Sequence, residues 1–319
     1  MPFVLGFGAV RLTYLPDVEP RPRRAAIGTF DGVHLGHREV IRGADTVVTF
    51  DPHPRSVIAP GSEPPLLTTL ERKAELVASL GVAEMVVIPF DRELAARSAR
   101  EFIDHVIVER LGARSVAVGE NFRFGHRAQG DAALLAADGR FETRIVPMLE
   151  VDGEVVSSTR IRELLAEGAV EEAARMLGAP FIIDGEVADG DKRGRELGFP
   201  TANLFPRPGY VTPAHGIYAC RVTLDDGQVV PAATSVGVRP QFDSELGELI
   251  EAHLIDWSGD LYGRRIRIEF LRRLRGEERF DSVEELVEQM GRDVEQARAV
   301  AATPGSSLTS GAAHDDADA

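Results

Sequence analysis

The stretch that decides the fold is "AAIGTFDGVHLGH", residues 25–37. It opens with a short apolar run, typical of a buried strand, and Gly28 and Gly32 then permit a tight turn. His34 and His37 follow three residues apart, and a helix that begins near Val33 would place both on one face. The pattern therefore predicts polar side chains directly behind a buried strand.

The same alternation of strand and helix patterns continues through the first half of the chain. Residues 45–50, 84–90 and 114–120 are short valine-rich runs bounded by turn residues. Between them, residues 70–81 and 99–112 carry apolar residues at helical spacing and end in glycine. This alternation predicts an α/β fold with a Rossmann-like parallel sheet covered by helices. Ligands of such sheets bind beyond the carboxyl ends of the strands, where the two histidines lie.

After Pro180 the pattern changes to strand-like runs that are separated by Gly and Asp turns. It predicts a small antiparallel β-barrel. We expect a C-terminal helix to follow Asp281, a suitable N-cap with Glu284 three residues later. One apolar stripe should dock this helix on the barrel, and it consists of Val283, Leu286, Val287, Met290 and Val294.

Length and charge limit the possible functions. The 319 residues suffice for two domains, predicted at residues 1–179 and 180–302, before a tail at 303–319 expected to be disordered. A net charge of −15 argues against sequence-independent binding of nucleic acid, but small phosphorylated ligands remain compatible with it. No apolar run could span a bilayer, and no signal peptide is evident. The single cysteine, Cys220, fits a reducing cytoplasm. We expect a cytoplasmic monomer or weak homo-oligomer without nucleic-acid or membrane partners.

The histidine pair has three interpretations when only the residues are considered. His34 and His37 could donate to phosphate oxygens as charge develops on a leaving pyrophosphate. They could also bind zinc, which would need further ligands, or form a plain surface pair. The context favours phosphate, because "TFDPHP" adds His53 behind the next strand and "VSSTRIRELL" opens a helix with three hydroxyl residues before arginines. An ordinary N-cap with surface arginines would explain that second segment equally well in isolation.

These motifs together resemble the nucleotidylyltransferase superfamily, and "GTFDGVHLGH", "TFDPHP" and "GENFRFGHRAQGD" resemble the adenylyltransferase module of bifunctional prokaryotic FAD synthetases. The resemblance implies that His34 and His37 stabilise the transition state at the α-phosphate. It implies that the nucleotide is bound by Gly28, Phe30, Asp31, Gly36, Ser158, Thr159 and Arg162. It further implies that His53, Asn121 and Phe122 lie beside FMN, although Phe122 could also be a core residue. The segment after His37 is shorter than is usual in this family, so the helix there should be short.

A second constellation lies in "GDKRGRELGFPTANL", residues 190–204. A flexible hairpin would explain its glycines and basic residues, but the Pro-Thr-Ala-Asn sequence resembles the signature of riboflavin kinases. The hydroxyl of Thr201 and the amide oxygen of Asn203 are hard ligands of the kind that Mg²⁺ accepts. The resemblance implies that Glu251 accepts the proton of the attacking ribityl hydroxyl. It also implies that Gly190, Lys192 and Gly194 belong to a phosphate-binding flap.

Both resemblances predict an ATP- and Mg²⁺-dependent enzyme that converts riboflavin to FMN and FMN to FAD. Two alternatives remain open at this point. One is an enzyme in which only one module is active, and the other is a non-catalytic sensor of flavin nucleotides. The departure of "SVGVRPQF" from the usual kinase motif, at Val238 and Gln241, concerns the details of the riboflavin pocket.

Overall fold

The computed structural model describes residues 10–189, 198–239 and 247–303. The chain divides into two compact units, Met1–Arg160 and Ile161–Ala319. This division falls earlier than the expected boundary at 179/180, because α7 (Ser158–Glu167) and α8 (Val170–Leu177) pack with the second unit. The Ala214 N–H, for example, donates to the Leu165 carbonyl at 2.9 Å. The expected tail falls almost entirely outside the described residues.

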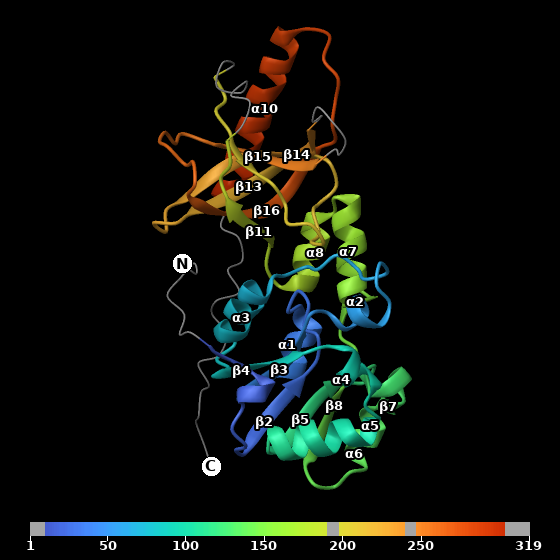
Figure 1. The fold of residues 1–319 in the computed structure, drawn as a ribbon. Helices are drawn as coiled ribbons and strands as arrows, with labels where there is room; N and C mark the ends of the chain where they lie inside the picture. The colour runs from blue at the N-terminus through green and yellow to red at the C-terminus, as the bar shows by residue number, and fades with distance from the viewer. Residues whose placement is uncertain (1–9, 190–197, 240–246, 304–319) are drawn as a thin grey trace, which may run out of the picture. The chain divides into compact units, whose positions relative to one another are not determined.

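The first unit is built on a parallel sheet of six strands (Figure 1). In their order across the sheet, the strands are β1 (Arg11–Tyr14), β4 (Glu84–Pro89), β3 (Thr46–Asp51), β2 (Arg23–Ile27), β5 (Ala113–Gly119) and β8 (Glu142–Val146). The four central strands confirm the sequence prediction. The two edge strands, β1 and β8, were not predicted, since their exposed residues interrupt the apolar pattern.

Helices and short elements connect these strands. The helices are α1 (Leu35–Ile41), α2 (Pro54–Ile58), α3 (Leu70–Ser79), α4 (Arg92–Ala96), α5 (Ala99–Glu101), η2 (Phe102–Arg110) and α6 (Ala132–Ala136). The short elements are η1 (Leu15–Asp17), β6 (Arg123–Phe124), η3 (His126–Ala128), β7 (Gly130–Asp131), β9 (Glu150–Val151) and β10 (Glu154–Val155). As expected, α1 is short.

The segment predicted as one helix at residues 99–112 begins with a capping box between Ser98 and Glu101 and continues as a π-helix, η2. The Leu111 N–H, for instance, donates to the carbonyl of Val106, five residues earlier. Phe102, Val106 and their apolar neighbours on η2 are buried, so the prediction of a buried apolar face was correct although the helix type was not.

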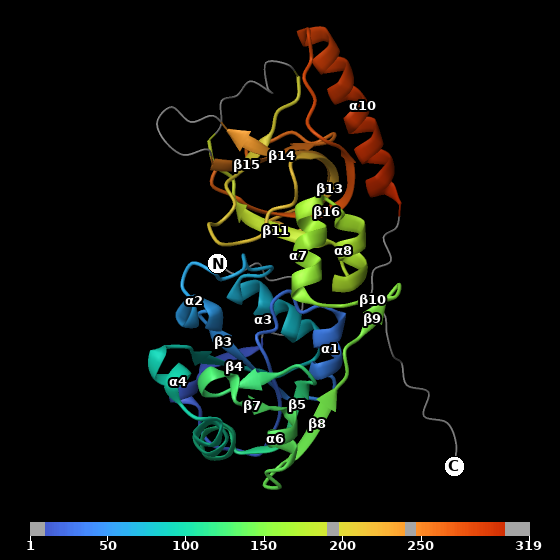
Figure 2. The same cartoon turned by 90° about the vertical axis from the view of Figure 1, so that its right-hand side faces the viewer.

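Alternate residues of the strands face two separate cores. Ile27 and Val48 pack with the apolar side chains of η2 and α6 on one face. Ala26 and Val47 pack with those of α1 and α3 on the other. Figure 2 shows α1 and α3 apart from α6, with the sheet between them. Burial on both faces explains why the central strands are almost continuously apolar.

The strand order reverses beside β2. The chain proceeds from β2 to its neighbour β3 and then to β4, and β5 returns to the opposite side of β2. Such a reversal leaves a crevice at the carboxyl end of the first strand, because the two connections diverge there. The turn that follows β2 therefore lies at the place where α/β proteins bind ligands.

The second unit contains a curled antiparallel sheet of six strands. In order these are β11 (Phe181–Glu186), β16 (Arg265–Arg275), β13 (Gly216–Leu224), β14 (Val229–Arg239), β15 (Gly247–Leu254) and β12 (Ala202–Leu204). A single bridge between Ala188, just after β11, and Asn203 on β12 joins the two ends. The predicted small barrel is thus a half-barrel, and one bridge joins the two ends of its sheet.

The C-terminal helix, α10 (Val283–Ala302), corrects two expectations. Its N-cap is Ser282, whose hydroxyl accepts from the Glu285 N–H at 3.2 Å, rather than Asp281. The expected stripe is wrong at its start, because Val283 is 57% exposed. The other four residues of the stripe are half-buried, and Val294 packs with Ala297 against Ala219 and Ile255 of the sheet unit.

A buried ion cluster joins three strands at the amino-terminal edge of the parallel sheet. The Glu84 carboxylate on β4 accepts hydrogen bonds from Arg11 (2.6 Å), Arg21 (2.7 Å) and Arg23 (2.8 Å). Burial alone would raise the pKa of Glu84, but the hydrogen bonds and charges of these arginines outweigh it and lower the pKa to about 2. The ionised carboxylate therefore stabilises the folded chain.

We predict that Glu84→Gln lowers the free energy of unfolding by about 3 kcal/mol at pH 7, the value that corresponds to the shift in pKa. Because the pKa in the folded chain lies below the ordinary 4.5, the stabilisation is complete above pH 4.5 and is lost as the pH falls towards 2. Urea unfolding followed by circular dichroism measures both effects. Asp45→Asn, which removes the partly exposed partner of Arg24, is the control and should change stability by less than about 1 kcal/mol. Equal effects of the two variants would contradict the prediction.

Candidate functional site

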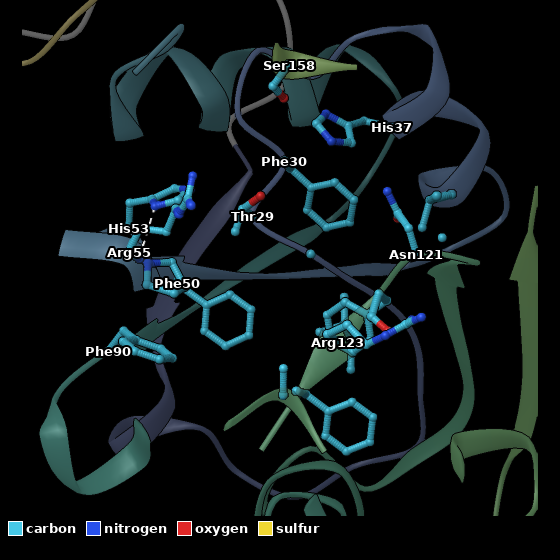
Figure 3. A pocket seen from close by; sticks show the side chains of 18 of the residues that line it. Thr29, Phe30, His37, Phe50, His53, Arg55, Phe90, Asn121, Arg123 and Ser158 are labelled. Carbon is cyan, nitrogen blue, oxygen red and sulfur yellow. Dashed lines mark hydrogen bonds between the residues drawn. The ribbon is translucent and has the colours of Figure 1, made fainter. Parts of the chain in front are cut away.

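A cavity of about 820 Å³ opens beyond the carboxyl end of β2, and its lining belongs entirely to the first unit. The volume lies within the range of small-molecule sites. Figure 3 shows the Phe30 ring in the middle of the labelled side chains, between Phe50 and Asn121, with His37 and Ser158 beyond it. The expected site residues that line the cavity are Gly28, Phe30, His34, Gly36, His37, His53, Asn121, Phe122, Ser158 and Thr159.

The two histidines form a stacked pair. His34 is the N-cap of α1, where its Nδ1 accepts from the His37 N–H at 3.2 Å. Since Nδ1 is an acceptor, the proton of the neutral ring is on Nε2. The ring centroids lie 3.5 Å apart, and the Phe30 ring meets His37 edge-on at 5.3 Å. The helix cap thus determines both the tautomer of His34 and the spacing of the pair.

Two glycines make room for these rings. A Cβ atom on Gly28 would lie 3.1 Å from the Phe30 ring, and one on Gly36 would lie 3.3 Å from the His34 ring. Either contact is tighter than ordinary van der Waals packing, so a side chain at these positions would displace the ring. Gly28 and Gly36 therefore contribute to the site by leaving space, whatever further contacts their backbones make with a nucleotide.

The turn after β2 is held from outside the cavity. The buried Asp31 carboxylate accepts from the Leu67 N–H at 2.9 Å and the Thr68 N–H at 3.1 Å. The Ser158 hydroxyl donates to the Asp31 carbonyl at 2.9 Å. The contacts seen for the Asp31 side chain therefore support the turn, and Ser158 connects the turn to the start of α7. Their expected contacts with the nucleotide stay predictions.

The backbone of this turn is strained. Phe30 and Val33 have φ angles of 47° and 41°, in the left-handed region that residues with bulky side chains rarely adopt. Both residues are about 1% exposed, so the core holds them there. Non-glycine residues in this conformation concentrate at functional sites, where surrounding contacts compensate the strain.

Two cations that the sequence reasoning missed bond the same turn. Arg38 Nε donates to the Val33 carbonyl at 3.2 Å. Lys73 Nζ on α3 donates to the Thr29 carbonyl at 2.7 Å. Burial lowers the pKa of both groups, and for Lys73 the charges of two aspartates oppose that effect. The helical pattern of residues 70–81 predicted where Lys73 lies, but no motif indicated that its side chain reaches the turn.

The start of α7 has both of the roles considered from the sequence. The Ser157 hydroxyl accepts from the Arg160 N–H at 3.1 Å, as an N-cap does, and Arg160 forms an ion pair with Glu154 at 2.8 Å. Ser158 and Thr159 line the cavity. Arg162 lies further along this helix, in the second unit, and its contact with nucleotide stays a prediction.

The other end of the cavity is aromatic. Phe122 is half-buried and stacks on Phe124 at 5.6 Å, and Phe124 itself is buried in the core. Phe50 and Phe90 add two more rings, which meet edge to face with their centroids 5.8 Å apart. The sequence reasoning did not identify these two residues as site residues. His53 caps α2 by accepting from the Arg55 N–H at 3.2 Å. This wall suits a flat aromatic ligand.

The second constellation is organised by strand register. Glu251 on β15 lies opposite Asn203 on β12 and opposite Ser235 on β14, so the three residues form a row across one face of the sheet. Residues directly opposite one another place their Cβ atoms about 5 Å apart. Thr201 stands two residues before Asn203, on the same side of an extended chain. The expected phosphate-binding residues Gly190, Lys192 and Gly194 lie outside the described residues, as does Gln241.

The environment of Asn203 fits a ligand. This residue is 6% exposed, and its Oδ1 is buried without a hydrogen-bond partner in the part of the chain that the structure describes. A buried amide oxygen normally has a donor or a cation, since leaving it unpaired costs free energy. His253 lies on the same face as Glu251. Its Nδ1 donates to the Pro200 carbonyl at 2.9 Å and so supports the turn that precedes Thr201.

Among the described residues, no group of three or more His, Cys, Asp or Glu side chains could hold a metal ion by itself. None of the helices described is long and apolar enough to cross a membrane.

Two family models match the chain. The model described as FAD synthetase matches residues 17–160, and the model described as riboflavin kinase matches residues 177–301. Most of α7 and all of α8 except its last residue, Leu177, fall between the two matches. A crystal structure described as a macrolide-efflux protein from Streptococcus pneumoniae superposes with a TM-score of 0.82 at 30% identity, covering 91% of this chain and 99% of that one.

Curated relatives extend over nearly the whole chain. The bifunctional riboflavin kinase/FMN adenylyltransferases of Escherichia coli K12 and Pseudomonas fluorescens are 37% and 38% identical to it over 285 and 291 residues. These matches cover 85% and 87% of this chain and 90% and 93% of the relatives. The Bacillus subtilis enzyme of the same name is 36% identical over 287 residues. The chain therefore belongs to the bifunctional riboflavin kinase/FMN adenylyltransferase family.

Proposed function

We propose that the two reactions of this bifunctional enzyme use the two constellations described above. The chain is a riboflavin kinase and an FMN adenylyltransferase. Riboflavin and ATP give FMN and ADP, and FMN and a second ATP give FAD and pyrophosphate. The observation that carries the assignment of residues is the stacked His34–His37 pair in a large cavity at the end of β2.

Adenylyl transfer takes place in the cavity of the first unit. A phosphate oxygen of FMN attacks the α-phosphorus of ATP, and the bond to the leaving pyrophosphate breaks. Negative charge grows on the oxygens of the phosphate chain during this step, and Nε2–H of His34 is a donor suited to it. His37 and Thr159 also line the cavity and add further donors, whereas the Ser158 hydroxyl already donates to the Asp31 carbonyl and holds the turn. Neither histidine acts as nucleophile or base in this assignment.

The aromatic wall receives the flavin. Phe50, Phe90 and Phe122 offer ring faces and edges to the isoalloxazine system, and Asn121 offers an amide that can bond its polar edge. His53 and Arg55 lie on the same side of the cavity as Phe50 and Phe90 (Figure 3). Nucleotide and flavin thus meet across Phe30, between the histidine end and the aromatic end.

Phosphorylation of riboflavin takes place beside the row of Asn203 and Glu251. The Glu251 carboxylate accepts the proton of the ribityl 5′-hydroxyl as that oxygen attacks the γ-phosphorus of ATP. Asn203 and Glu251 lie opposite each other on adjacent strands, so the register keeps the base and the expected metal ligand at constant separation. The Thr201 hydroxyl adds a second oxygen ligand beside Asn203.

The residues present fit a divalent cation such as Mg²⁺. Thr201 and Asn203 supply neutral oxygen ligands, and the buried Asn203 Oδ1 has no other partner among the described residues. Neutral ligands suit a cation that arrives with ATP, because the phosphates provide the negative charge. When bound, Mg²⁺ neutralises charge on the phosphates.

We further place the enzyme in the cytoplasm as a monomer or weak homo-oligomer whose partners are riboflavin, FMN and ATP. The buried single cysteine, Cys220, supports a reducing compartment. Incubation with riboflavin, ATP and Mg²⁺ tests the whole assignment, since the enzyme should produce both FMN and FAD. An enzyme with one active module would produce one product at most, and a sensor would leave riboflavin unchanged.

The first prediction concerns the histidine pair. Replacing both His34 and His37 with alanine should lower the kcat of FAD formation at least 10²-fold, because donors to the transition state are lost. Riboflavin phosphorylation by the same protein should not change. His105→Ala, at an exposed histidine on η2, is the matched control and should behave as wild type. Adenylyl transfer within threefold of wild type in the double variant would refute the role given to the pair.

The second prediction concerns Glu251. Glu251→Gln keeps the shape of the side chain but cannot take up a proton, so riboflavin kinase kcat should fall by roughly 10²–10⁴-fold. The KM values of riboflavin and ATP should change little, and FMN supplied directly should still become FAD. Glu248→Gln, at an exposed glutamate of the same strand, is the control. Near-normal turnover of Glu251→Gln would remove Glu251 from the mechanism.

The third prediction concerns the boundary between the units. A fragment of residues 161–303 should phosphorylate riboflavin and make no FAD. A fragment of residues 180–303 should melt at a lower temperature, because it lacks α7 and α8 and their contacts, such as Arg273 with the Glu167 carbonyl at 3.1 Å. Scanning calorimetry and kinase assays compare the two fragments. Equal melting temperatures would show that the two helices do not stabilise the kinase unit.

A further inference from the structure

Lys73 is a buried cation that the assignment above does not use. Its side chain extends from α3 to the underside of the turn after β2, and the residue is 7% exposed. Nζ donates to the Thr29 carbonyl at 2.7 Å and to the Thr49 hydroxyl at 3.2 Å. Burying an ammonium group is unfavourable, and desolvation accordingly lowers the pKa of Lys73 while Asp31 and Asp51 oppose the shift. Because burying the Lys73 ammonium is unfavourable, we infer that this charge has a role.

The composition of the chain makes this lysine exceptional. Of the 36 basic residues, only Lys73 and Lys192 are lysines, and all the others are arginines. Arginine has a wide planar head, whereas the ammonium of lysine is compact and can approach two oxygens from one point. A chain that uses arginine nearly everywhere has kept lysine at a buried position whose Nζ fits between Thr29 and Thr49. The position therefore requires the compact group.

The contact controls the orientation of one peptide group. In a trans peptide the C=O and the following N–H point in opposite directions. The Thr29 carbonyl accepts from Lys73 and, at 3.0 Å, from the Thr49 hydroxyl, so the Phe30 N–H is directed away from both. That N–H has no acceptor among the described residues. Thr29 and Phe30 both line the cavity and Lys73 does not, so the peptide group that Lys73 bonds from behind borders the cavity.

We propose that Lys73 is a positioning residue for adenylyl transfer. Its ammonium holds the Thr29 carbonyl, keeps the strained turn at Phe30 in place, and so presents the Phe30 N–H and the His34–His37 pair to the phosphate chain of ATP. Lys73 touches neither substrate and acts through the turn. The proposal rests on the assignment of adenylyl transfer to this cavity.

The test is steady-state kinetics of Lys73→Met, which keeps the length of the side chain but removes the charge and the donors. The kcat of FMN adenylylation should fall by roughly 10–100-fold, because donors that act in the transition state are no longer aligned. The KM of FMN should change by less than about threefold, since the aromatic wall is untouched. Lys73→Arg should also lose at least about fivefold in kcat, since its larger head does not fit between the two oxygens. Glu71→Gln, at an exposed residue of the same helix, is the control and should stay within about threefold.

Binding of FMN without ATP, measured by quenching of flavin fluorescence, shows whether each variant is folded. A normal kcat in Lys73→Met or in Lys73→Arg would overturn the proposal, and so would a loss in Glu71→Gln as large as that in Lys73→Met. Loss of FMN binding by both Lys73 variants would also overturn it, because Lys73 would then be required for folding. Failure of the wild-type protein to adenylylate FMN would instead refute the proposed function and is therefore a separate outcome.

Discussion

Hydrogen bonds to the carbonyl oxygens of one turn are the constraint on which the first unit depends. The carbonyls of Thr29, Asp31 and Val33 accept from Lys73, Ser158 and Arg38. These donors come from α1, which directly follows the turn, and from α3 and α7, which are distant from it in sequence. The N–H groups of Gly32 and Val33 are engaged as well, by the Thr68 hydroxyl and the Phe30 carbonyl, so the turn is held through both kinds of backbone group. The helix cap by His34 and the stacking of the two imidazoles follow from the same arrangement.

The second unit positions its polar groups by different means. There a regular antiparallel ladder places Asn203, Glu251 and Ser235 in one row, with no strained turn among them. The inner face of β15 is anchored by Ile250, Ala252 and Leu254, which are at most 5% exposed. The first unit thus relies on turn conformation, and the second on strand register, to hold its polar groups in place.

Much of this could be predicted from the sequence, and the failures have physical reasons. Central strands buried on both faces have an unmistakable apolar pattern, so the sheet and the place of the histidines were predictable. The edge strand β8 alternates irregularly with exposed residues, and the N-cap of α10 differed by one position because Asp281 and Ser282 are both good caps. Lys73 and Phe50 were missed as site residues because their roles arise from tertiary contact, and neither belongs to a local motif that indicates one.

The row across the half-barrel also bears on how this family can vary. Side chains alternate along a strand with a period of two, so one residue inserted or deleted within β12 or β15 would turn Asn203 or Glu251 to the opposite face. It would also break the single bridge between Ala188 and Asn203 that joins the ends of the sheet. We therefore expect changes of length in the connections between strands, where they would leave the ladder intact, and no odd-numbered change within β12 or β15.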